Sequence, residues 1–213
     1  MGQRRNGPPR FGTDGIRGVA NSELTPEIAV ALGRAAARHL QGSAFLLGRD
    51  SRRSGPMLQA ALAAGIASEG RDVIDVGMIP TPGLAWLAGE QRRPAAMISA
   101  SHNPYEDNGI KLFSPGGTKL PLQVELAIHD ELDRLFGTSA GEEMGGEAGS
   151  SGEIGADPEQ LTAYAARLLA IVDSPGQSGA GKSSPAGSLG GEVVIDCANG
   201  AASVLVPLIF EQL

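Results

Sequence analysis

Residues 95–113 read AAMISASHNPYEDNGIKLF, and the rest of the chain is predicted outward from this stretch. The apolar run Ala95–Ile98 predicts a short buried strand, and Ile110–Phe113 predicts a second one. The loop between them carries hydroxyl, imidazole, carboxylate and amide groups, and Lys111 follows it. Binding and catalytic groups tend to sit on loops that hang from buried strands. The stretch therefore predicts an α/β sheet with a functional loop at its rim.

Ser101 is the candidate reactive group of this loop. A serine hydroxyl is a poor nucleophile until a base or a metal assists it, and His102 and Lys111 are the candidate helpers. Neighbours in an extended strand point to opposite sides, so Ser101 and His102 need not touch. The residues support a reactive or phosphate-binding serine without fixing a dyad. The alternative is a polar turn in which Asn103 and Asn108 bond to the backbone, and composition alone favours that alternative.

Composition excludes several classes of protein. The chain has 213 residues, enough for one large or two small domains. Its net charge of −7 argues against a nucleic-acid partner, because a face for the phosphate backbone needs clustered basic residues. The one cysteine, Cys197, excludes an internal disulfide framework. With no signal peptide and no apolar run near about 20 residues, we expect a cytoplasmic protein without a membrane partner.

Helices and strands are predicted to alternate around the serine loop. Thr25-Pro26-Glu27 has the marks of a helix start: an N-cap hydroxyl, an early proline and an acid near the positive end of the helix dipole. That helix should run to about His39. Further elements are predicted as a strand at 44–47, a helix from about 54 to 70, a strand at 72–76, a short helix from 80 and, after the loop, a helix at 121–136. This order favours a layered αβα domain.

Two tracts rich in glycine interrupt this pattern. Residues 138–156 are predicted to be a linker at a domain boundary, because they hold few apolar groups. Residues 174–191 contain a literal P-loop pattern, GQSGAGKS at 176–183. Such a loop needs a strand before it and a helix after it. Here a helix is predicted before it and Pro185 follows, so we interpret the pattern as a chance match in a spacer.

The predicted domains follow from these tracts. Residues 1–10 are basic and are expected to form a flexible N-terminus. Residues 11–137 should form a complete first domain with the serine loop. Residues 157–213 are expected to be the truncated start of a second, similar α/β domain. Within that part, we predict a helix from Asp157 to about Val172, a strand at Glu192–Cys197 and a helix from Ala201.

Two further motifs carry charge. In FGTDGIRG, residues 11–18, Arg17 could clamp a phosphate with two donors or could pair with Asp14 to pin a turn. The residues leave both readings open. In GRDSR, residues 48–52, the basic groups could form an anion site at a helix start. A solvated basic turn is the plainer interpretation.

The serine loop resembles the active-serine loop of the α-D-phosphohexomutase family. The resemblance rests on SASHNP at 99–104 followed by DNGIK at 107–111. Three other motifs agree with the family in order and spacing: FGTDGIRG at 11–18, GRDSR at 48–52 and VIDCANGA at 194–201. Other branches of the family usually carry different motifs at the N-terminus and at the serine. Taken together, the four motifs of this chain therefore most resemble those of the phosphoglucosamine mutase branch. The resemblance covers nearly the whole chain from Arg10, apart from two spacers.

The resemblance implies an intramolecular phosphotransferase of the isomerase class. Such an enzyme interconverts glucosamine 6-phosphate and glucosamine 1-phosphate through a phosphoserine and a bisphosphate intermediate, in the synthesis of amino-sugar nucleotides and peptidoglycan precursors. By resemblance, Ser101 is the phosphoserine and, through its phosphate, a ligand of Mg²⁺. Lys111, His102 and Arg17 are then expected as catalytic residues that also contact phosphate. A phosphosugar substrate is implied, and a homodimer is expected for the full-length form.

The family's metal loop, Asp-Gly-Asp-x-Asp-Arg, has no counterpart between residues 157 and 213. We therefore expect this chain to be the N-terminal portion of a longer enzyme and to be inactive alone. The alternatives are a fragment of a phosphomannomutase or phosphoglucomutase, and a non-catalytic anion-binding domain. A serine hydrolase using Ser101 and His102 is disfavoured, because the sequence shows no nucleophile elbow and no acid placed to orient the histidine.

Overall fold

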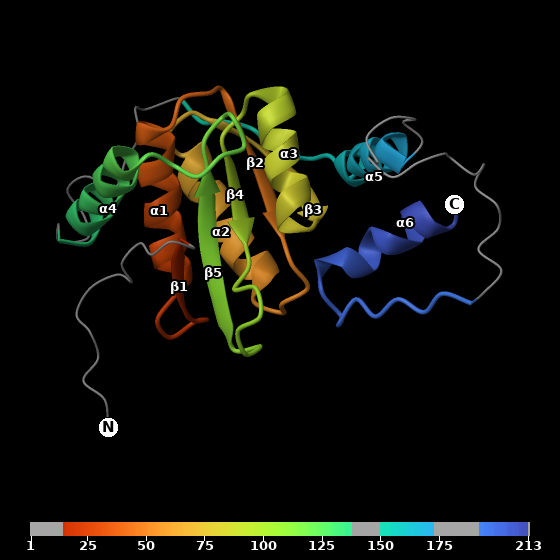
Figure 1. The fold of residues 1–213 in the computed structure, drawn as a ribbon. Coiled ribbons are helices and arrows are strands. Elements are labelled where there is room, and N and C mark those ends of the chain that lie inside the picture. Colours follow the sequence, from red (N-terminus) through yellow and green to blue (C-terminus); the bar gives the residue numbers. More distant parts are fainter. Residues whose placement is uncertain (1–14, 138–149, 173–191, 213) are drawn as a thin grey trace.

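The computed structural model describes residues 15–137, 150–172 and 192–212. Within these residues a six-stranded sheet forms the centre, in the order β1-β5-β4-β2-β3-β6 (Figure 1). The pairs β2–β3, β2–β4 and β3–β6 are parallel, whereas β5 is antiparallel to both β4 and β1. The strands are Ile16–Val19 (β1), Ala44–Arg49 (β2), Asp72–Met78 (β3), Ala95–Ile98 (β4), Asp107–Phe113 (β5) and Ile154–Ala156 (β6).

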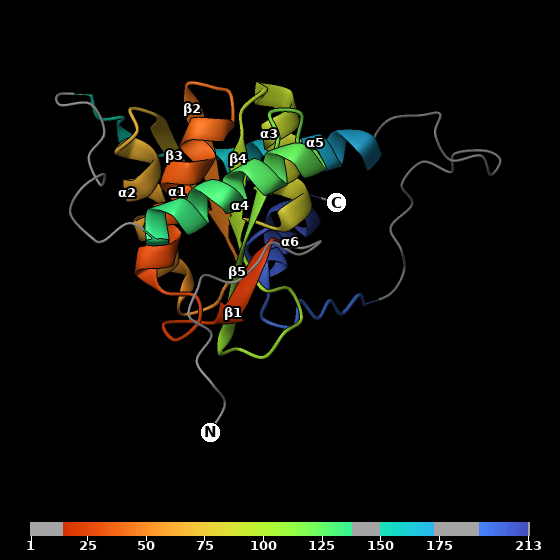
Figure 2. The ribbon, with the colours of Figure 1, turned by 90° about the vertical axis from the view of Figure 1, so that its left-hand side faces the viewer.

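Helices cover both faces of the sheet, which confirms the predicted αβα layers (Figure 1). One layer contains α1, α2 and α4, and Figure 2 shows α4 lying in front of the sheet, where it contacts α1. The opposite layer contains α3 and α5. The helices are Pro26–His39 (α1), Gly55–Ala67 (α2), Thr81–Gln91 (α3), Leu122–Gly137 (α4) and Glu159–Val172 (α5), followed by a 3₁₀ turn at Ala201–Val204 (η1) and α6 at Val206–Phe210.

The central strands are buried on both faces, as expected for a sheet between two helical layers. In β2, Phe45 and Leu47 join the core beneath α1 and α2, while Leu46 joins the core beneath α3. The side chains alternate between faces with a period of two, so an unbroken apolar run fills both cores. This explains why β2 and β4 read as continuous hydrophobic stretches.

Helix α1 begins as its sequence predicts and packs unusually close to α2. The Thr25 hydroxyl accepts a hydrogen bond from the Ile28 amide at 3.4 Å. A Cβ added at Gly33 would lie 2.4 Å from the Leu62 carbonyl oxygen, and one at Gly65 would lie 2.1 Å from that of Val30. The two glycines therefore allow the helix backbones to meet at a distance that no side chain would permit.

The structure differs from the prediction for the tract 138–156. Its described end contains β6, which pairs with β3 in the first sheet, and α5 packs against α3 and β3. Sequence reasoning missed β6 because this edge strand has only three residues, all exposed, and so no hydrophobic alternation. The domain boundary placed in this tract stays a prediction.

The strand predicted at Glu192–Cys197 is wrong. The segment has no strand assignment, and Val194 is 86% exposed. An apolar run becomes a strand only when a neighbour supplies backbone hydrogen bonds, and none of the described strands pairs with it. The helix predicted from Ala201 is present in short form as η1 and α6. The segment is joined to the rest of the described chain by the Ser51 hydroxyl, which donates to the Asn199 carbonyl at 2.6 Å, and by packing of Leu205 against Tyr164 of α5.

Some expectations fall on residues that the structure does not describe. The flexible N-terminus predicted for residues 1–10, and the spacer with the P-loop pattern at 176–183, lie outside the described residues. Among the described helices, none has the length and apolar character needed to cross a membrane.

Candidate active site

Ser101 lies in the loop that joins β4 to β5. The Ser99 amide donates to the Gly109 carbonyl at 2.9 Å, after which the chain leaves the sheet. Ser101 is exposed and has a φ of 56°, in the left-handed region. For a residue with a side chain this conformation costs about 1–2 kcal/mol. The surrounding structure must therefore hold the serine in place.

His102 is next to the serine hydroxyl in space as well as in sequence. The distance between Ser101 Oγ and His102 Nδ1 is 3.3 Å, and both residues are exposed. Sequence reasoning noted that strand neighbours need not touch. The structure brings them together because the left-handed turn at Ser101 ends the alternation of an extended strand.

Arg17 reaches the loop from β1, on the far side of β5. It pairs with Gly109 in the sheet, and its Nη1 donates to the Asn103 side-chain oxygen at 3.4 Å. A Cβ at Gly109 would lie 2.9 Å from Arg17 Cγ, so the glycine lets the arginine cross the strand closely. Asn103 Nδ2 also donates to Asp107 Oδ2 at 2.9 Å. Arg17 is thus placed beside the serine loop, and its predicted contact with phosphate stays a prediction.

Lys111 lies on β5, opposite Met97 of β4. It is half-buried, and its Nζ lies 5.7 Å from the centre of the Phe113 ring. That geometry allows a cation–π contact with the ring. Lys111 therefore sits on the strand that carries the loop back into the sheet.

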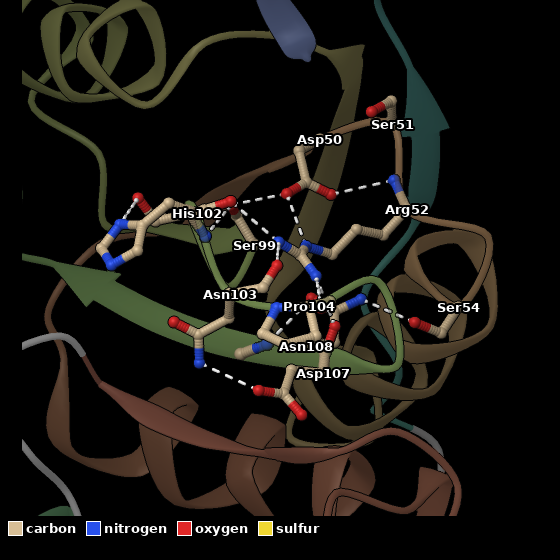
Figure 3. Close-up of polar contacts among 12 residues, drawn as sticks. Asp50, Ser51, Arg52, Ser54, Ser99, His102, Asn103, Pro104, Asp107 and Asn108 are labelled. Carbon is tan, nitrogen blue, oxygen red and sulfur yellow. Dashed lines mark hydrogen bonds and ion pairs between the residues drawn. The ribbon is translucent and has the colours of Figure 1, made fainter. Parts of the chain in front are cut away.

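Arg52 binds the serine loop more extensively than any of the predicted residues (Figure 3). Its Nη2 donates to the carbonyls of Ser101 at 2.8 Å and Asn103 at 2.9 Å. Its Nη1 donates to the carbonyls of Pro104 and, at 2.8 Å, Asp107. The side chain is only 9% exposed. The solvated basic turn favoured from sequence is therefore wrong for Arg52.

Asp50 supports both Arg52 and the start of the loop. Its Oδ2 accepts from Arg52 Nε at 3.1 Å and from the Ser99 hydroxyl at 2.7 Å. Its Oδ1 accepts from the Arg52 amide at 3.0 Å. The Ser99 hydroxyl in turn accepts from the Ser101 amide at 3.0 Å. One carboxylate is thus connected to both sides of Ser101.

Asn108 anchors the other end of the loop. It is fully buried at the start of β5, where its Nδ2 donates to the Ser54 hydroxyl at 2.9 Å and its Oδ1 accepts from the Gly109 amide at 2.8 Å. Ser54 precedes α2 but makes no side-chain cap bond. Its hydroxyl is therefore used to tie the loop to the helix start.

The described residues do not form a metal-binding cluster. They contain no group of three or more His, Cys, Asp or Glu side chains placed to hold a metal ion. A phosphate on Ser101 would supply oxygen ligands of the kind that Mg²⁺ prefers, but the described side chains do not complete such a site.

The predicted residues Ser101, His102 and Arg17 lie at or beside one loop, but sequence reasoning missed the residues that support this loop. Asp50 and Ser99 were not singled out, and Arg52 was considered only within the GRDSR turn, as part of an anion site or of a solvated basic turn. A single sequence gives no signal for a hydrogen bond between residues about 50 positions apart. Only the motif GRDSR marked this turn, through the family resemblance.

The chain was compared with known proteins. A family model described as "Phosphoglucomutase/phosphomannomutase, alpha/beta/alpha domain I" matches residues 8–136. The chain therefore belongs to the phosphoglucomutase/phosphomannomutase family and carries its domain I. The αβα layers formed by α1 to α4 and β1 to β5 lie within the matched residues, except for Gly137 at the end of α4.

Curated proteins that are similar to this chain carry a more specific name than the family does. A phosphoglucosamine mutase of Carboxydothermus hydrogenoformans is 45% identical over 214 residues, covering 95% of this chain and 43% of the relative. One of Rubrobacter xylanophilus is 46% identical over 206 residues, covering 95% of this chain and 42% of the relative. The chain thus spans less than half the length of these relatives.

Solved structures agree on the fold. A putative phosphomannomutase from Thermus thermophilus matches with a TM-score of 0.64 at 28% identity, covering 77% of this chain and 36% of that one. A phosphoglucomutase/phosphomannomutase family protein from Burkholderia thailandensis matches with a TM-score of 0.61 at 30% identity, covering 75% of this chain and 35% of that one.

Proposed function

We propose that the protein carrying this chain is a phosphoglucosamine mutase, which interconverts glucosamine 6-phosphate and glucosamine 1-phosphate. The observation that carries the proposal is Ser101, an exposed hydroxyl held in a left-handed turn beside His102. The relatives at about 45% identity bear this name. The phosphosugar substrate and the place of the reaction in cell-wall precursor synthesis belong to the same proposal.

In the first step, the phosphoryl group on Ser101 Oγ passes to the free 1-hydroxyl of glucosamine 6-phosphate. The bond between phosphorus and the serine oxygen breaks and a bond between phosphorus and the sugar oxygen forms, while the sugar hydroxyl gives up its proton and the serine oxygen takes up one. The product is glucosamine 1,6-bisphosphate. After this intermediate reorients, its 6-phosphate returns to Ser101, which leaves glucosamine 1-phosphate and restores the phosphoserine.

The side chains around Ser101 suit this chemistry. Phosphoryl transfer asks the protein mainly for positioning and for neutralisation of charge. His102 Nδ1, 3.3 Å from the serine oxygen, is placed to exchange a proton with it as the phosphate leaves or returns. Arg17 on β1 contacts Asn103 of the loop, and Lys111 lies on β5, the strand that follows the loop; both would supply positive charge.

Mg²⁺ is part of the proposal as a cofactor bound through the phosphate on Ser101. When bound, it would draw charge from that phosphate and so favour transfer. The described residues supply no cluster of three further ligands. The roles proposed for His102, Arg17 and Lys111 rest on the positions of these side chains and do not depend on where the metal binds.

The identity of the sugar needs a test of its own, because the solved structures with similar folds are named for phosphomannomutase and phosphoglucomutase activity. Steady-state assays of the intact protein with glucosamine, glucose and mannose phosphates distinguish these substrates. We expect the highest kcat/KM with glucosamine phosphate and loss of turnover in Ser101→Ala. A higher kcat/KM with another sugar would contradict the substrate, and turnover by Ser101→Ala would contradict the phosphoserine.

A purely anion-binding domain is the competing function. It predicts saturable phosphate binding without any phosphoserine or turnover in the intact wild-type protein. The same assays, combined with the mass of the purified protein, separate the two functions.

A further inference from the structure

We propose that Asp50, Arg52 and Ser99 form a clamp that positions Ser101 for phosphoryl transfer. The proposal rests on the proposed function, because it assigns positioning residues to that reaction. Arg52 and Ser99 bind the backbone of the serine loop, and Asp50 binds both of these side chains (Figure 3). Their contribution is to fix where the serine oxygen sits.

Arg52 is a positioning group because its donors are already used. A guanidinium group has five N–H donors in a fixed plane. One binds Asp50, and the other four bind the carbonyls of Ser101, Asn103, Pro104 and Asp107. This leaves no donor for a substrate phosphate. The guanidinium group instead connects the start of the loop, at Ser101, to its end, at Asp107.

Ser99 holds the other side of the serine. Its hydroxyl donates to Asp50 and accepts the Ser101 amide at 3.0 Å. The Ser101 carbonyl is held by Arg52 at 2.8 Å. Asp50 binds both Ser99 and Arg52. The amide and the carbonyl of Ser101 are therefore both connected, through one side chain each, to the Asp50 carboxylate. Fixing these two groups fixes the left-handed backbone and hence the direction of the side chain.

Burial strengthens this arrangement. Asp50 is 8% exposed and the Arg52 side chain 9% exposed, so water competes little for their hydrogen bonds. Arg53, the next residue, is exposed. Arg53 therefore serves as a matched control for Arg52: it has the same charge and lies next to it in sequence, but it is exposed.

The test compares Arg52→Ala with Arg53→Ala in the intact protein. A displacement of about 1 Å in a reacting group can lower a rate about 100-fold. We expect Arg52→Ala to slow single-turnover transfer from phosphorylated Ser101 to glucosamine 6-phosphate about 100-fold. The KM should change little, because every Arg52 donor binds Asp50 or the loop backbone and none is left for the substrate. Arg53→Ala should match the wild type.

Two readouts separate positioning from general stability. Added guanidinium should restore Arg52→Ala at least about tenfold but leave Arg53→Ala unchanged, since the free ion can reoccupy the fork site. Amide hydrogen exchange at residues 101–108 should become faster in Arg52→Ala and in the milder Ser99→Ala. If Arg52→Ala fails to fold, Ser99→Ala and Arg52→Lys, whose ammonium cannot span the fork, give the same comparison.

The possible failures are distinct. Transfer by Arg52→Ala within about threefold of the wild type, or slow transfer without guanidinium rescue and without faster exchange, would overturn the clamp alone. Absence of phosphoryl transfer in the wild-type protein would overturn the proposed function, and the role of the clamp in transfer with it.

Discussion

At the scale of single residues, the backbone of Ser101 is as informative as its hydroxyl. Its φ of 56° is a conformation that glycine adopts freely and that other residues adopt at a cost. Such strained residues cluster at functional sites, so a serine in this conformation indicates that its hydroxyl has a function. The conformation and the reactivity of Ser101 can be tested separately, because alanine and glycine both remove the hydroxyl.

We predict that Ser101→Gly is more stable than Ser101→Ala by about 0.5–1 kcal/mol. Loss of the Cβ relieves about 1–2 kcal/mol of strain, and the greater freedom of glycine in the unfolded chain offsets about 0.4–1 kcal/mol. Urea unfolding of both variants measures the difference. Equal stability, or a more stable alanine variant, would show that the left-handed turn is not strained. Neither variant should carry phosphate at position 101.

At the scale of elements, the contact between α1 and α2 depends on two glycines. We predict that Gly65→Ala destabilises the protein by about 1–3 kcal/mol, as overpacking commonly does, because its Cβ would lie 2.1 Å from the Val30 carbonyl oxygen. Gly155→Ala on β6 is the matched control, since nothing lies within 4 Å of its added Cβ. Thermal unfolding compares the two. A harmless Gly65→Ala would mean that the helices are farther apart than described.

Helix α4 is joined to α1 by charge. Glu131 accepts hydrogen bonds from Arg134 at 2.8 Å and from Arg38 of α1. The hydrogen bond from Arg134 is the largest of the causes that lower the pKa of Glu131 from 4.5 to about 2; burial opposes it and the bond from Arg38 adds to it. Because the folded pKa lies below the unfolded one, the ionised form stabilises the fold. That contribution is complete above about pH 4.5 and is lost as the pH falls toward 2.

We therefore predict that Glu131→Gln is less stable than the wild type at pH 7 and that the gap narrows as the pH falls from 4.5 to 2. Urea unfolding at several pH values measures the gap. Glu90→Gln, at an exposed position on α3, reports the general effect of removing one charge. A gap for Glu131→Gln that is constant with pH would contradict the ion pairs assigned to this residue.

At the scale of the whole molecule, the layers were predictable because their signals are local. The cap at Thr25, the apolar runs of β2 and β4, and the alternation of helices with strands lie within short windows of sequence. These features need no information about distant residues. The serine loop is also marked by polar groups that follow a buried strand, but these residues alone favoured a polar turn, and the family resemblance was needed to interpret it as an active-serine loop.

The features that sequence reasoning predicted wrongly or missed have one physical cause in common. The strand predicted at 192–197 required a hydrogen-bonding neighbour, and β6 formed because β3 offered one to an exposed segment. Likewise, Arg52 became a loop-binding residue because the fold brings it to Ser101, 49 positions away. Pairing between distant segments decides such features, and a single sequence does not reveal it.

The proposed reaction depends on Ser101 carrying the phosphate that moves. The most direct measurement is to phosphorylate the intact protein with a ³²P-labelled hexose bisphosphate, map the labelled peptide, and then add unlabelled glucosamine 6-phosphate. We predict one label, on Ser101, which the sugar phosphate removes. A label on another residue, or a label on Ser101 that glucosamine 6-phosphate fails to remove, would contradict the proposed reaction.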